Sequence, residues 1–454
     1  MTVATMLPDE AVHELKAALR GDLLRPGDAE YDQARRVWNG MIDRRPALIA
    51  RCTGVADVLR AVAFARERGL VVAIRSGGHN VAGSAICDDG LVIDLSRMKG
   101  MRVDPARRTA QAEAGLTWGE FDRETQAFGL AVTGGAISST GIAGLTLGGG
   151  QGWLMRKYGL TSDNLLAVDL VTADGQFLTA SDDEHADLFW GLRGGGGNFG
   201  VATSFTYRLH PEHVLLAGMV LHPIERAGQA LRHWRDFTRT APDELTSAAG
   251  LLTSPDGVAV AAILIFYAGS LEQGERVVRP LRELGPPLVD QVGPMPYTAL
   301  QGMLDGAFPA GINNYWKSNY LTGLTDEAID GLVAHFRDVP SPLSSVLLEH
   351  VGGAMNRLPK DATAFAHRGA AYNFLGISSW TDPAETEANI DWARAVSEQM
   401  RPQSSGIYVN YLGAEDEAQV RAAYGASYER LAALKARYDP TNFFSQNQNI
   451  RPRS

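Results

Sequence analysis

The chain has 454 residues, of which 45% are hydrophobic and 21% charged, and its formal net charge is −10. These proportions are typical of a globular protein, and the length favours two domains over one. The acidic balance argues against a nucleic-acid partner and against an anionic membrane surface, because both attract basic patches.

Cysteine usage and hydropathy narrow the class of protein further. Only two cysteines occur, Cys52 and Cys87, so neither a disulfide framework nor a CxxC metal motif is present. The first residues lack the pattern of a secretory signal, and no apolar run has the length of a membrane span. We therefore expect a cytoplasmic enzyme or binding protein without a membrane partner.

The first predicted elements alternate between strand and helix. Apolar side chains at helical spacing predict a helix over 53–69, with Thr53 as N-cap and Gly69 as the stop. Apolar runs at 70–74 and 91–98 predict short strands, and the loop "RSGGHN" (75–80) follows the first of them. This alternation favours an α+β or α/β layer over a helical bundle.

Glycine clusters dominate the region up to about residue 210. One cluster spans 134–152, and a four-glycine run, Gly194–Gly197, lies between predicted strands at 165–172 and 201–209. Glycine permits positive φ and close approach of the backbone, and successive backbone N–H groups in such turns bind anions. Taken together, the loops predict a groove for the pyrophosphate of a dinucleotide, with His79 beside it.

Two other binding patterns are disfavoured by their context. Residues 195–200 match G-x-G-x-x-G literally, but a strand follows where a Rossmann motif needs a helix. His210 and His213 lie close together without a third ligand nearby, so we expect surface histidines and no metal site.

The composition changes after residue 212, where glycine clusters become rarer. A helix with Thr325 as its cap is predicted around 325–336, Asp382-Pro383 opens another, and 424–438 is helical. We expect a cofactor-binding domain over 1–212 (core about 44–212) and a substrate domain over 213–404. Residues 405–454 are expected to return to the first domain.

The motifs in this order resemble a known family. "RSGGHNVAG", "GLTLGGGQGWLMRKYGLTSDNL" and "LFWGLRGGGGNFGV" are similar to the FAD-binding domain of the vanillyl-alcohol-oxidase superfamily, and "YVNYLG" and "LKARYDPTNFFSQNQNI" to its berberine-bridge-enzyme-like branch. The resemblance covers nearly the whole chain. It implies an α+β, two-domain, PCMH-type FAD-binding fold, whose substrate domain is an antiparallel sheet covered by helices.

The resemblance also implies how FAD is held. In this family the histidine of the R-S-G-G-H loop, here His79, bonds covalently to the 8α-methyl of the flavin. The place of the cysteine that gives many relatives a second bond is taken by Ile137, with Ser138 beside it, so a single attachment is expected, as in bacterial members similar to 6-hydroxy-D-nicotine oxidase. The other implied cofactor contacts are Arg75, Ser76, Gly77, Gly78, Asn80, Gly134, Ile137, Ser138, Gly141, Gly144, Gly200, Val201 and Asn447.

Hydride transfer to a flavin needs a group that takes the proton of the adjacent O–H or N–H. By resemblance this is the tyrosine of an Asn-Tyr pair, Tyr411, with Tyr408 as the alternative; Tyr411 as an aromatic wall without a catalytic role stays open. A tyrosine has a pKa near 10 and would need a cation or strong hydrogen bonds to act as a base at neutral pH. Polar and aromatic alternation in the second domain suggests further substrate contacts: Tyr315, Lys317, His350, Asn356 and Tyr372.

The expected activity is an FAD-linked oxidase of a small alcohol or amine, with oxygen as electron acceptor. Alternatives are a sugar or oligosaccharide oxidase or dehydrogenase, a natural-product tailoring oxidase, and a flavin-binding protein without turnover. The Asn-Tyr pair and the aromatic segment around Tyr315 argue against the last of these. The residues leave the substrate and the oligomeric state open.

Overall fold

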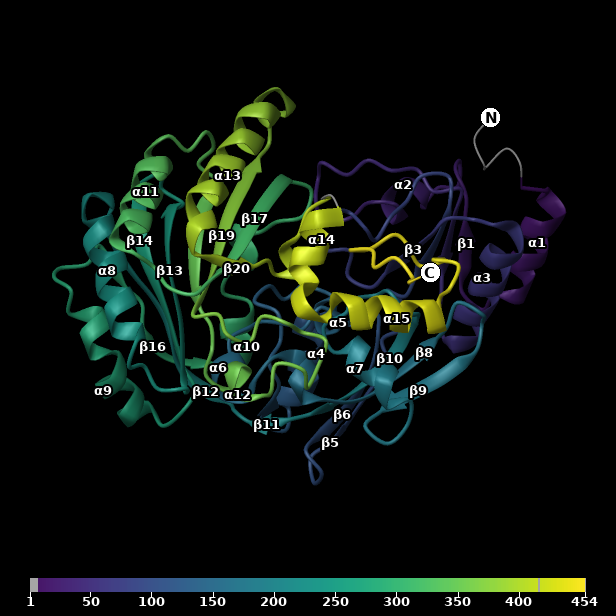
Figure 1. Cartoon of the computed structure of the whole chain (residues 1–454), viewed down its shortest axis with the longest axis horizontal. Helices are drawn as coiled ribbons and strands as arrows, with labels where there is room; N and C mark the ends of the chain where they lie inside the picture. Colours follow the sequence, from purple (N-terminus) through teal and green to yellow (C-terminus); the bar gives the residue numbers. More distant parts are fainter. Residues whose placement is uncertain (1–6, 415–416, 454) are drawn as a thin grey trace.

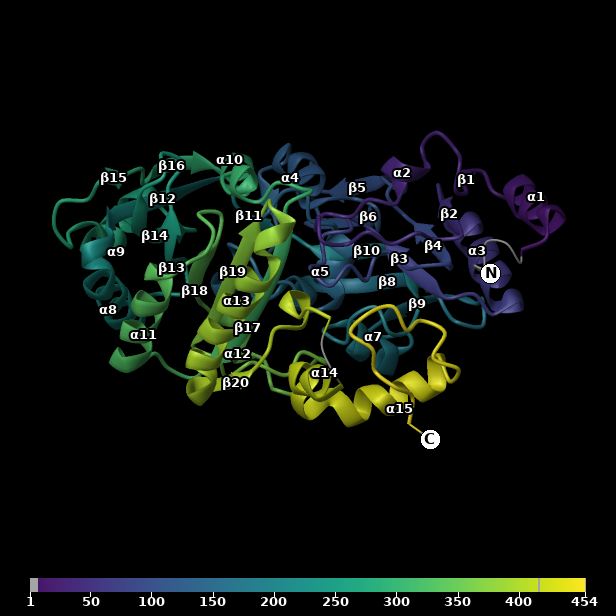
Figure 2. The same ribbon diagram turned by 90° about the horizontal axis from the view of Figure 1, so that it is seen from above.

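The computed structural model describes residues 7–414 and 417–453. Two halves lie side by side (Figures 1 and 2). Among the described residues, one half contains a four-stranded, a five-stranded and a two-stranded sheet (β7, Leu130–Ala131, with β11, His210–Pro211) and long glycine-rich loops, and the other contains one large antiparallel sheet with helices on its outer face. The expected α+β class, with an antiparallel sheet covered by helices, is confirmed. Within the described ranges, every helix is too short or too polar to cross a bilayer.

A four-stranded sheet begins the first half, in the order β1–β2–β4–β3, with β2, β4 and β3 parallel. The second predicted strand ends four residues early, because the Asp94 carboxylate accepts a hydrogen bond from the Ser96 amide (3.0 Å) and turns the chain. The strands are β1 (Asp22–Leu24), β2 (Leu48–Arg51), β3 (Val72–Arg75) and β4 (Leu91–Asp94).

Helix α3 (Val55–Arg68) packs beside this sheet. It ends at Gly69, whose φ of 62° is left-handed, as the sequence predicts. The predicted N-cap is wrong by one residue, since Gly54 occupies that position. The Thr53 amide and hydroxyl instead donate to the Asp57 carboxylate, at 2.9 and 3.0 Å.

A five-stranded antiparallel sheet completes the first half, in the order β5–β6–β10–β8–β9. Its central strand β10 follows the four-glycine run, which confirms the prediction of a strand there. The strands are β5 (Met101–Asp104), β6 (Thr109–Glu113), β8 (Leu165–Val171), β9 (Phe177–Ser181) and β10 (Val201–Arg208). The remaining elements of this half are α1 (Asp9–Ala18), α2 (Tyr31–Ala34), α4 (Trp118–Gln126), β7 (Leu130–Ala131), α5 (Ile142–Leu147), α6 (Met155–Tyr158), η2 (Thr161–Asn164), α7 (Ala186–Leu192) and β11 (His210–Pro211).

The second half is one antiparallel sheet in the order β15–β12–β14–β13–β18–β19–β17–β20, with β16 also paired to β12. Its strands are β12 (Val214–Pro223), β13 (Leu245–Thr253), β14 (Ala259–Tyr267), β15 (Val289–Asp290), β16 (Gly293–Pro296), β17 (Asn313–Leu321), β18 (Ser345–His350), β19 (Tyr372–Trp380) and β20 (Ser404–Gly406).

Helices cover the outer face of this sheet (Figure 1). The predicted cap Thr325 is confirmed, because its hydroxyl accepts from the Ala328 amide (3.3 Å). Asp382-Pro383 opens a helical segment as predicted, and the Asp382 carboxylate accepts from the Ala384 amide (2.9 Å). The covering helices are α8 (Ala227–Thr238), α9 (Leu271–Arg282), α11 (Asp326–Arg337) and α13 (Thr386–Met400). Shorter helices are η3 (Ile224–Arg226), α10 (Tyr297–Gln301), η4 (Asp305–Ala307), α12 (Ala354–Arg357), η5 (Pro383–Glu385) and η6 (Arg401–Gln403).

Both faces of the central strands are covered. All nine residues of β19 are buried, although successive side chains point to opposite faces. Phe374 packs in the core beneath the helices, whereas Leu375 and Ile377 face the first half. Because neither face of β19 meets water, its residues do not alternate between buried and exposed.

The C-terminal residues return to the first half, as the yellow ribbon in Figure 1 shows. They form η7 (Val409–Tyr411), α14 (Glu417–Tyr424), η8 (Gly425–Ser427) and α15 (Tyr428–Tyr438). The fully buried ammonium of Lys435 donates to the Asp439 carboxylate (2.7 Å) and to the carbonyls of Asn198 (2.7 Å) and Phe444 (2.9 Å). This lysine therefore joins the last residues to the glycine loop that precedes β10.

Candidate active site

A cavity of about 310 Å³ lies where the glycine loops face the large sheet. The loops at 76–81, 135–153 and 196–200 form one wall, and strands β13, β14, β17, β18 and β19 form the other. Residues 408–411 and 444–448 contribute from the C-terminal segment. Three parts of the chain that are distant in sequence thus share one site.

Some glycines of the cavity wall keep space open beside the backbone, while others, such as Gly77 and Gly141, let two backbone segments pack against each other. Gly78 and Gly196 have φ values of 65° and 70°, which L side chains rarely adopt. A Cβ at Gly144 or Gly197 would meet no atom within 4 Å and would occupy free space. Such a wall allows close approach of a phosphate to backbone N–H groups, so it fits the pyrophosphate of a dinucleotide.

His79 lines the same cavity and stacks on Trp38, with ring centroids 4.4 Å apart and an interplanar angle of 17°. Its Nε2 is shielded from solvent and has no hydrogen-bond partner within the residues that the structure describes. Burial lowers the pKa of His79 to about 4. The imidazole is therefore neutral at physiological pH, with a lone pair available for a covalent bond.

Most of the predicted cofactor contacts do line the cavity. They are Ser76, Gly77, Gly78, His79, Asn80, Ile137, Gly141, Gly144, Gly200 and Asn447.

Four predicted cofactor contacts do not line it. Arg75 forms a buried ion pair with Asp94 and also donates to the Ala34 carbonyl, so its guanidinium is used within the first half. The Ser138 amide donates to Asp305 (2.8 Å), and its hydroxyl bonds to the same carboxylate. Gly134, against Trp118, and Val201, on β10, also lie outside.

The chemically distinctive part of the cavity is a tyrosine–glutamate pair. The Tyr411 hydroxyl donates to Glu349 Oε1 at 3.3 Å, and Asn373 Nδ2 donates to Oε2 at 2.7 Å. Burial raises the pKa of Glu349 to about 7, although the two hydrogen bonds oppose the rise. Burial, and then the Glu349 charge, raise the pKa of Tyr411 well above its usual value. Near neutral pH, Glu349 is therefore the group of this pair that exchanges a proton.

Tyr408, the alternative base, has a different environment. Its hydroxyl oxygen accepts from the amides of Gly150 and Gln151, both at 3.1 Å, and from Asn410 Nδ2 at 2.9 Å. Burial raises its pKa to about 12 despite these donors. The three donors occupy the oxygen on which a proton would arrive, so Tyr408 anchors the glycine loop in this structure.

The rest of the sheet-side wall is mostly apolar and aromatic, with Thr246 and Ser247 on β13 as its polar residues besides Glu349. Among the described residues that line the cavity, Glu349 is the one acidic side chain, and there is no lysine or arginine. Trp316 lies edge-on to Tyr411, with centroids 5.9 Å apart. The neighbouring apolar side chains are Trp153, Leu264, Phe266, Leu304, Phe308, Leu347, Leu375 and Ile377.

None of the five predicted substrate contacts lines the cavity. Four of them lie on strands, where successive side chains point to opposite faces of the sheet, and these four point to the helix-covered face. The side chains of Tyr315 and Lys317 lie on the face of β17 that packs against α13. There the Arg394 guanidinium donates to the Tyr315 hydroxyl (3.3 Å). Trp316, between them in sequence, points to the other face and lines the cavity. Asn356 lies in α12 and donates to the Ala370 carbonyl (3.0 Å).

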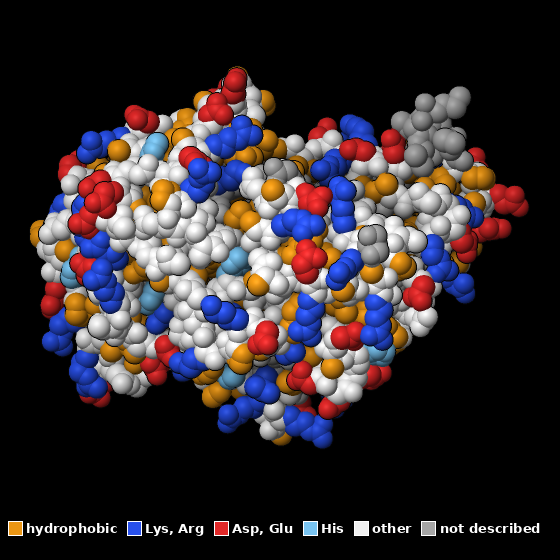
Figure 3. Space-filling view, viewed as in Figure 1, with side chains coloured by type: hydrophobic (Ala, Val, Ile, Leu, Met, Phe, Trp, Pro, Cys, Tyr) orange, Lys and Arg blue, Asp and Glu red, His pale blue; other side chains and the backbone are white. Residues whose placement is uncertain are grey.

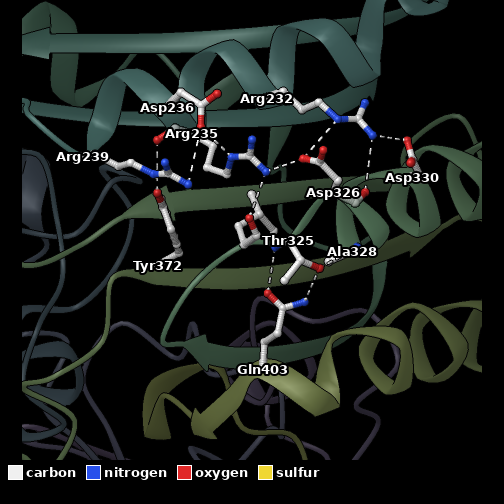
Figure 4. Close-up of polar contacts among 11 residues, drawn as sticks. Arg232, Arg235, Asp236, Arg239, Thr325, Asp326, Ala328, Asp330, Tyr372 and Gln403 are labelled. Atoms are coloured by element: carbon white, nitrogen blue, oxygen red, sulfur yellow. Dashed lines mark hydrogen bonds and ion pairs between the residues drawn. The ribbon is translucent and has the colours of Figure 1, made fainter.

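His350 and Tyr372 likewise point to the helix-covered face. His350 Nε2 accepts from the Arg156 guanidinium (3.0 Å), and the Tyr372 hydroxyl bonds to Thr238 on α8 (2.8 Å). Figure 4 shows Tyr372 beside the arginines of α8, in a polar network that links α8 to α11. At the surface this region carries interleaved basic and acidic side chains (Figure 3).

Sequence reasoning missed the cavity residues of the opposite parity. Glu349, next to His350, and Trp316, between Tyr315 and Lys317, line the cavity. Asn373, next to Tyr372, does not line it but donates a hydrogen bond to Glu349. Residues two apart in a strand share a face of the sheet. Had Glu349 in "LLEH" been taken as the functional residue, the alternate residues of β18 that include it would have been assigned to the cavity face. Gln151 was also missed, since the glycine cluster around it predicts only turns.

Comparisons with known proteins agree with this geometry. Residues 46–181 match the family described as FAD binding domain, and residues 407–451 match the family described as berberine and berberine like. An FAD-linked oxidoreductase of Dictyostelium discoideum is 33% identical, over 98% of this chain and 97% of its own length.

Two solved structures share the fold. The 6-hydroxy-D-nicotine oxidase from Arthrobacter nicotinovorans has a TM-score of 0.88 and 31% identity, covering 96% of this chain and 98% of that one. The carbohydrate oxidase from Microdochium nivale has a TM-score of 0.85 and 25% identity, covering 98% and 100%. With its glycine-walled cavity and matches over almost its full length, the chain belongs to the berberine-bridge-enzyme-like FAD-linked oxidoreductases, and it is an FAD-dependent enzyme with the PCMH-type fold.

Proposed function

We propose that this oxidoreductase is an oxidase of a small alcohol or amine, which loses a hydride from a C–H bond and a proton from the adjacent O–H or N–H. The observation that carries the proposal is the Tyr411–Glu349 pair in the cavity that also contains His79 and the glycine loops. FAD, when bound, supplies the acceptor for the hydride, and oxygen is proposed as the final electron acceptor.

The proton leaves through the pair in two linked transfers. The substrate O–H or N–H gives its proton to the Tyr411 oxygen while the Tyr411 proton passes to Glu349 Oε1. Tyr411 thereby returns to its neutral form, and Glu349 ends protonated. Because the pKa of Glu349 is about 7, its carboxylate is a matched acceptor at physiological pH, whereas a tyrosine alone would be too weakly ionised.

The cavity walls support an apolar or aromatic substrate. Trp316, Phe308 and Phe266 offer flat surfaces, and one carboxylate provides the ionisable group. A substrate with one O–H or N–H on a flat, mostly apolar body satisfies Tyr411 without burying further polar groups unpaired.

A sugar or oligosaccharide is the second candidate substrate. The overall likeness to the carbohydrate oxidase from Microdochium nivale supports it. The apolar walls count against it, because each buried sugar hydroxyl without a partner lowers affinity.

We further propose that FAD is attached covalently through His79 alone. The neutral imidazole and the unpartnered Nε2 support this bond. Ile137 and Ser138 offer no thiol, and Cys52 and Cys87 are buried away from the cavity. Mass spectrometry of a proteolytic digest should find one flavin, on the peptide that contains His79; FAD released by acid precipitation would contradict the proposal.

A peroxide assay tests the function as a whole. Aromatic and aliphatic alcohols, secondary amines and mono- and oligosaccharides are supplied to the holoenzyme under air, and hydrogen peroxide and flavin bleaching are followed. We expect peroxide with an apolar alcohol or amine. Bleaching without peroxide would identify a dehydrogenase, peroxide with sugars alone would favour the second candidate, and no bleaching with any class would reject turnover.

A further inference from the structure

Asn373 lies beside Glu349 and is fully buried. The two residues are directly paired across β18 and β19, and Asn373 Nδ2 donates to Glu349 Oε2 at 2.7 Å. The same nitrogen is 3.4 Å from Gln151 Oε1, and Gln151 Nε2 donates to the Tyr320 hydroxyl at 2.5 Å. One side-chain amide, that of Asn373, therefore reaches the carboxylate at the oxygen that Tyr411 does not use, and Gln151 in turn contacts this amide.

This arrangement gives the two carboxylate oxygens separate tasks. With Oε2 held by Asn373, Oε1 is the oxygen presented to Tyr411. The ionisable groups that face Glu349 are the hydroxyls of Tyr411, Tyr408 and Tyr320. In the part of the chain that the structure describes, no lysine or arginine lies close enough to shift its pKa. Neutral hydrogen-bond donors alone thus stabilise the anion against desolvation.

We propose that Asn373 is a positioning residue for the oxidation: its amide holds one oxygen of the Glu349 carboxylate and orients the other toward Tyr411. The same hydrogen bond lowers the pKa of Glu349 against the effect of burial. The inference rests on the proposed role of the Tyr411–Glu349 pair as proton acceptor. Asn373 acts through Glu349 and needs no contact with the substrate.

Infrared difference spectra of the holoenzyme as a function of pH test this directly, without a substrate. Loss of a band in Glu349→Gln identifies the protonated carboxyl of Glu349, and the wild-type midpoint is expected at about pH 7. Asn373→Leu should move the midpoint up by about 1 to 2 pH units, the effect of losing one hydrogen bond to a charged group. Asn373→Asp should also move it upward, because two carboxylates then compete for one proton.

Ser378→Ala is the matched control. Ser378 lies on the same strand, faces the helices and bonds to the buried Asn389 at 3.0 Å, so the variant loses a buried hydrogen bond outside the cavity. Its midpoint should equal that of the wild type. Equal midpoints in wild type and Asn373→Leu would overturn the inference, as would a Glu349 carboxyl that does not titrate near neutrality. If Asn373→Leu does not fold, Asn373→Asp decides.

A further variant, Tyr411→Phe, used beside Asn373→Leu, separates this inference from the proposed function. A shifted Glu349 midpoint together with normal flavin reduction in Tyr411→Phe would reject the proposed proton acceptor and leave the hold of Asn373 on Glu349 standing. If the Glu349 midpoint is unshifted in Asn373→Leu while flavin reduction is slow in Tyr411→Phe, the role of Asn373 is rejected and the proposed proton acceptor stands.

Discussion

At the scale of single residues, the site combines a neutral imidazole with an acid whose pKa lies near neutrality. Burial produces both shifts, but in opposite directions on the pKa scale, because it disfavours the charged form of each group. The neutral imidazole suits the proposed bond to the flavin, and the acid suits the proposed exchange of a proton. Tyr411 lines the cavity beside Glu349 and, in the proposed transfer, needs no anionic form of its own.

Tyr411→Phe removes the hydroxyl that bonds to Glu349 and that is proposed to take the substrate proton. Flavin reduction in a stopped-flow experiment should slow by about 10²- to 10⁴-fold, the range of general acid–base catalysis. Tyr315→Phe is the control, because its hydroxyl bonds to Arg394 on the helix-covered side of the sheet. A mild effect of Tyr411→Phe would leave Tyr411 as an aromatic wall only.

The pH dependence of the same rate follows from Glu349. The carboxylate is the accepting form, so the rate should rise with pH and level off above about pH 7. Glu349→Gln should be slow and should lose this rise, while the flavin remains bound. A rise through pH 7 that persists in Glu349→Gln would assign it to another group.

His79→Ala tests whether the proposed covalent bond to FAD is made by His79. The variant should bind FAD through the glycine loops but release it on denaturation, as measured by the absorbance of the precipitated protein. A yellow precipitate that persists in this variant would show that another residue carries the flavin.

At the scale of elements, the strand period decides which predictions succeed. Tyr315, Lys317, His350 and Tyr372 have the polar or aromatic character expected of substrate contacts, yet all four belong to the parity that faces the helices. In a sheet covered on both faces, each parity is buried, so hydropathy does not identify the cavity side. The glycine loops were predictable because positive φ and close approach leave a mark in the residue type itself.

The buried Lys435–Asp439 pair makes a prediction for the C-terminal segment. Lys435→Met leaves the Asp439 carboxylate without its cation and two carbonyls without a donor. We expect a loss of about 3 kcal/mol in the free energy of unfolding. Arg437 lies on the same helix as Lys435 and forms an exposed ion pair with Asp187 of α7, so Arg437→Met should change the free energy of unfolding little. Denaturant unfolding of both variants measures the difference, and equal losses would contradict this account.

At the scale of the whole molecule, the cavity exists only because the two halves remain docked. The buried Arg156 of α6 donates to the carbonyls of Leu245 (2.8 Å) and Val351 (2.7 Å) in the second half. Nothing in the local sequence around Arg156 signals this role, because its partners are backbone atoms about 90 and 200 residues away. Contacts of this kind depend on the assembled fold and were not predictable from motifs.

Arg156→Met should weaken the docking of the halves. Two buried carbonyls lose their donors, and we expect a loss of about 3 kcal/mol in the free energy of unfolding. Arg357→Met is a matched control, since Arg357 is exposed and pairs with Asp243, which also lies near Arg156. Calorimetry should show a clear drop in Tm for the first variant only, and a similar drop for both would place the effect in the shared Asp243.

The contribution of residues 444–448 to the cavity has a consequence for biosynthesis. Until that stretch has left the ribosome, the nascent polypeptide lacks one side of the cavity. It also lacks the hydrogen bond from the Lys435 ammonium to the Phe444 carbonyl, which holds the stretch in place. Stable retention of FAD is therefore a late event, which must wait until both halves and this stretch have been translated. A nascent chain stalled before residue 444 should carry folded sheets yet fail to keep the flavin.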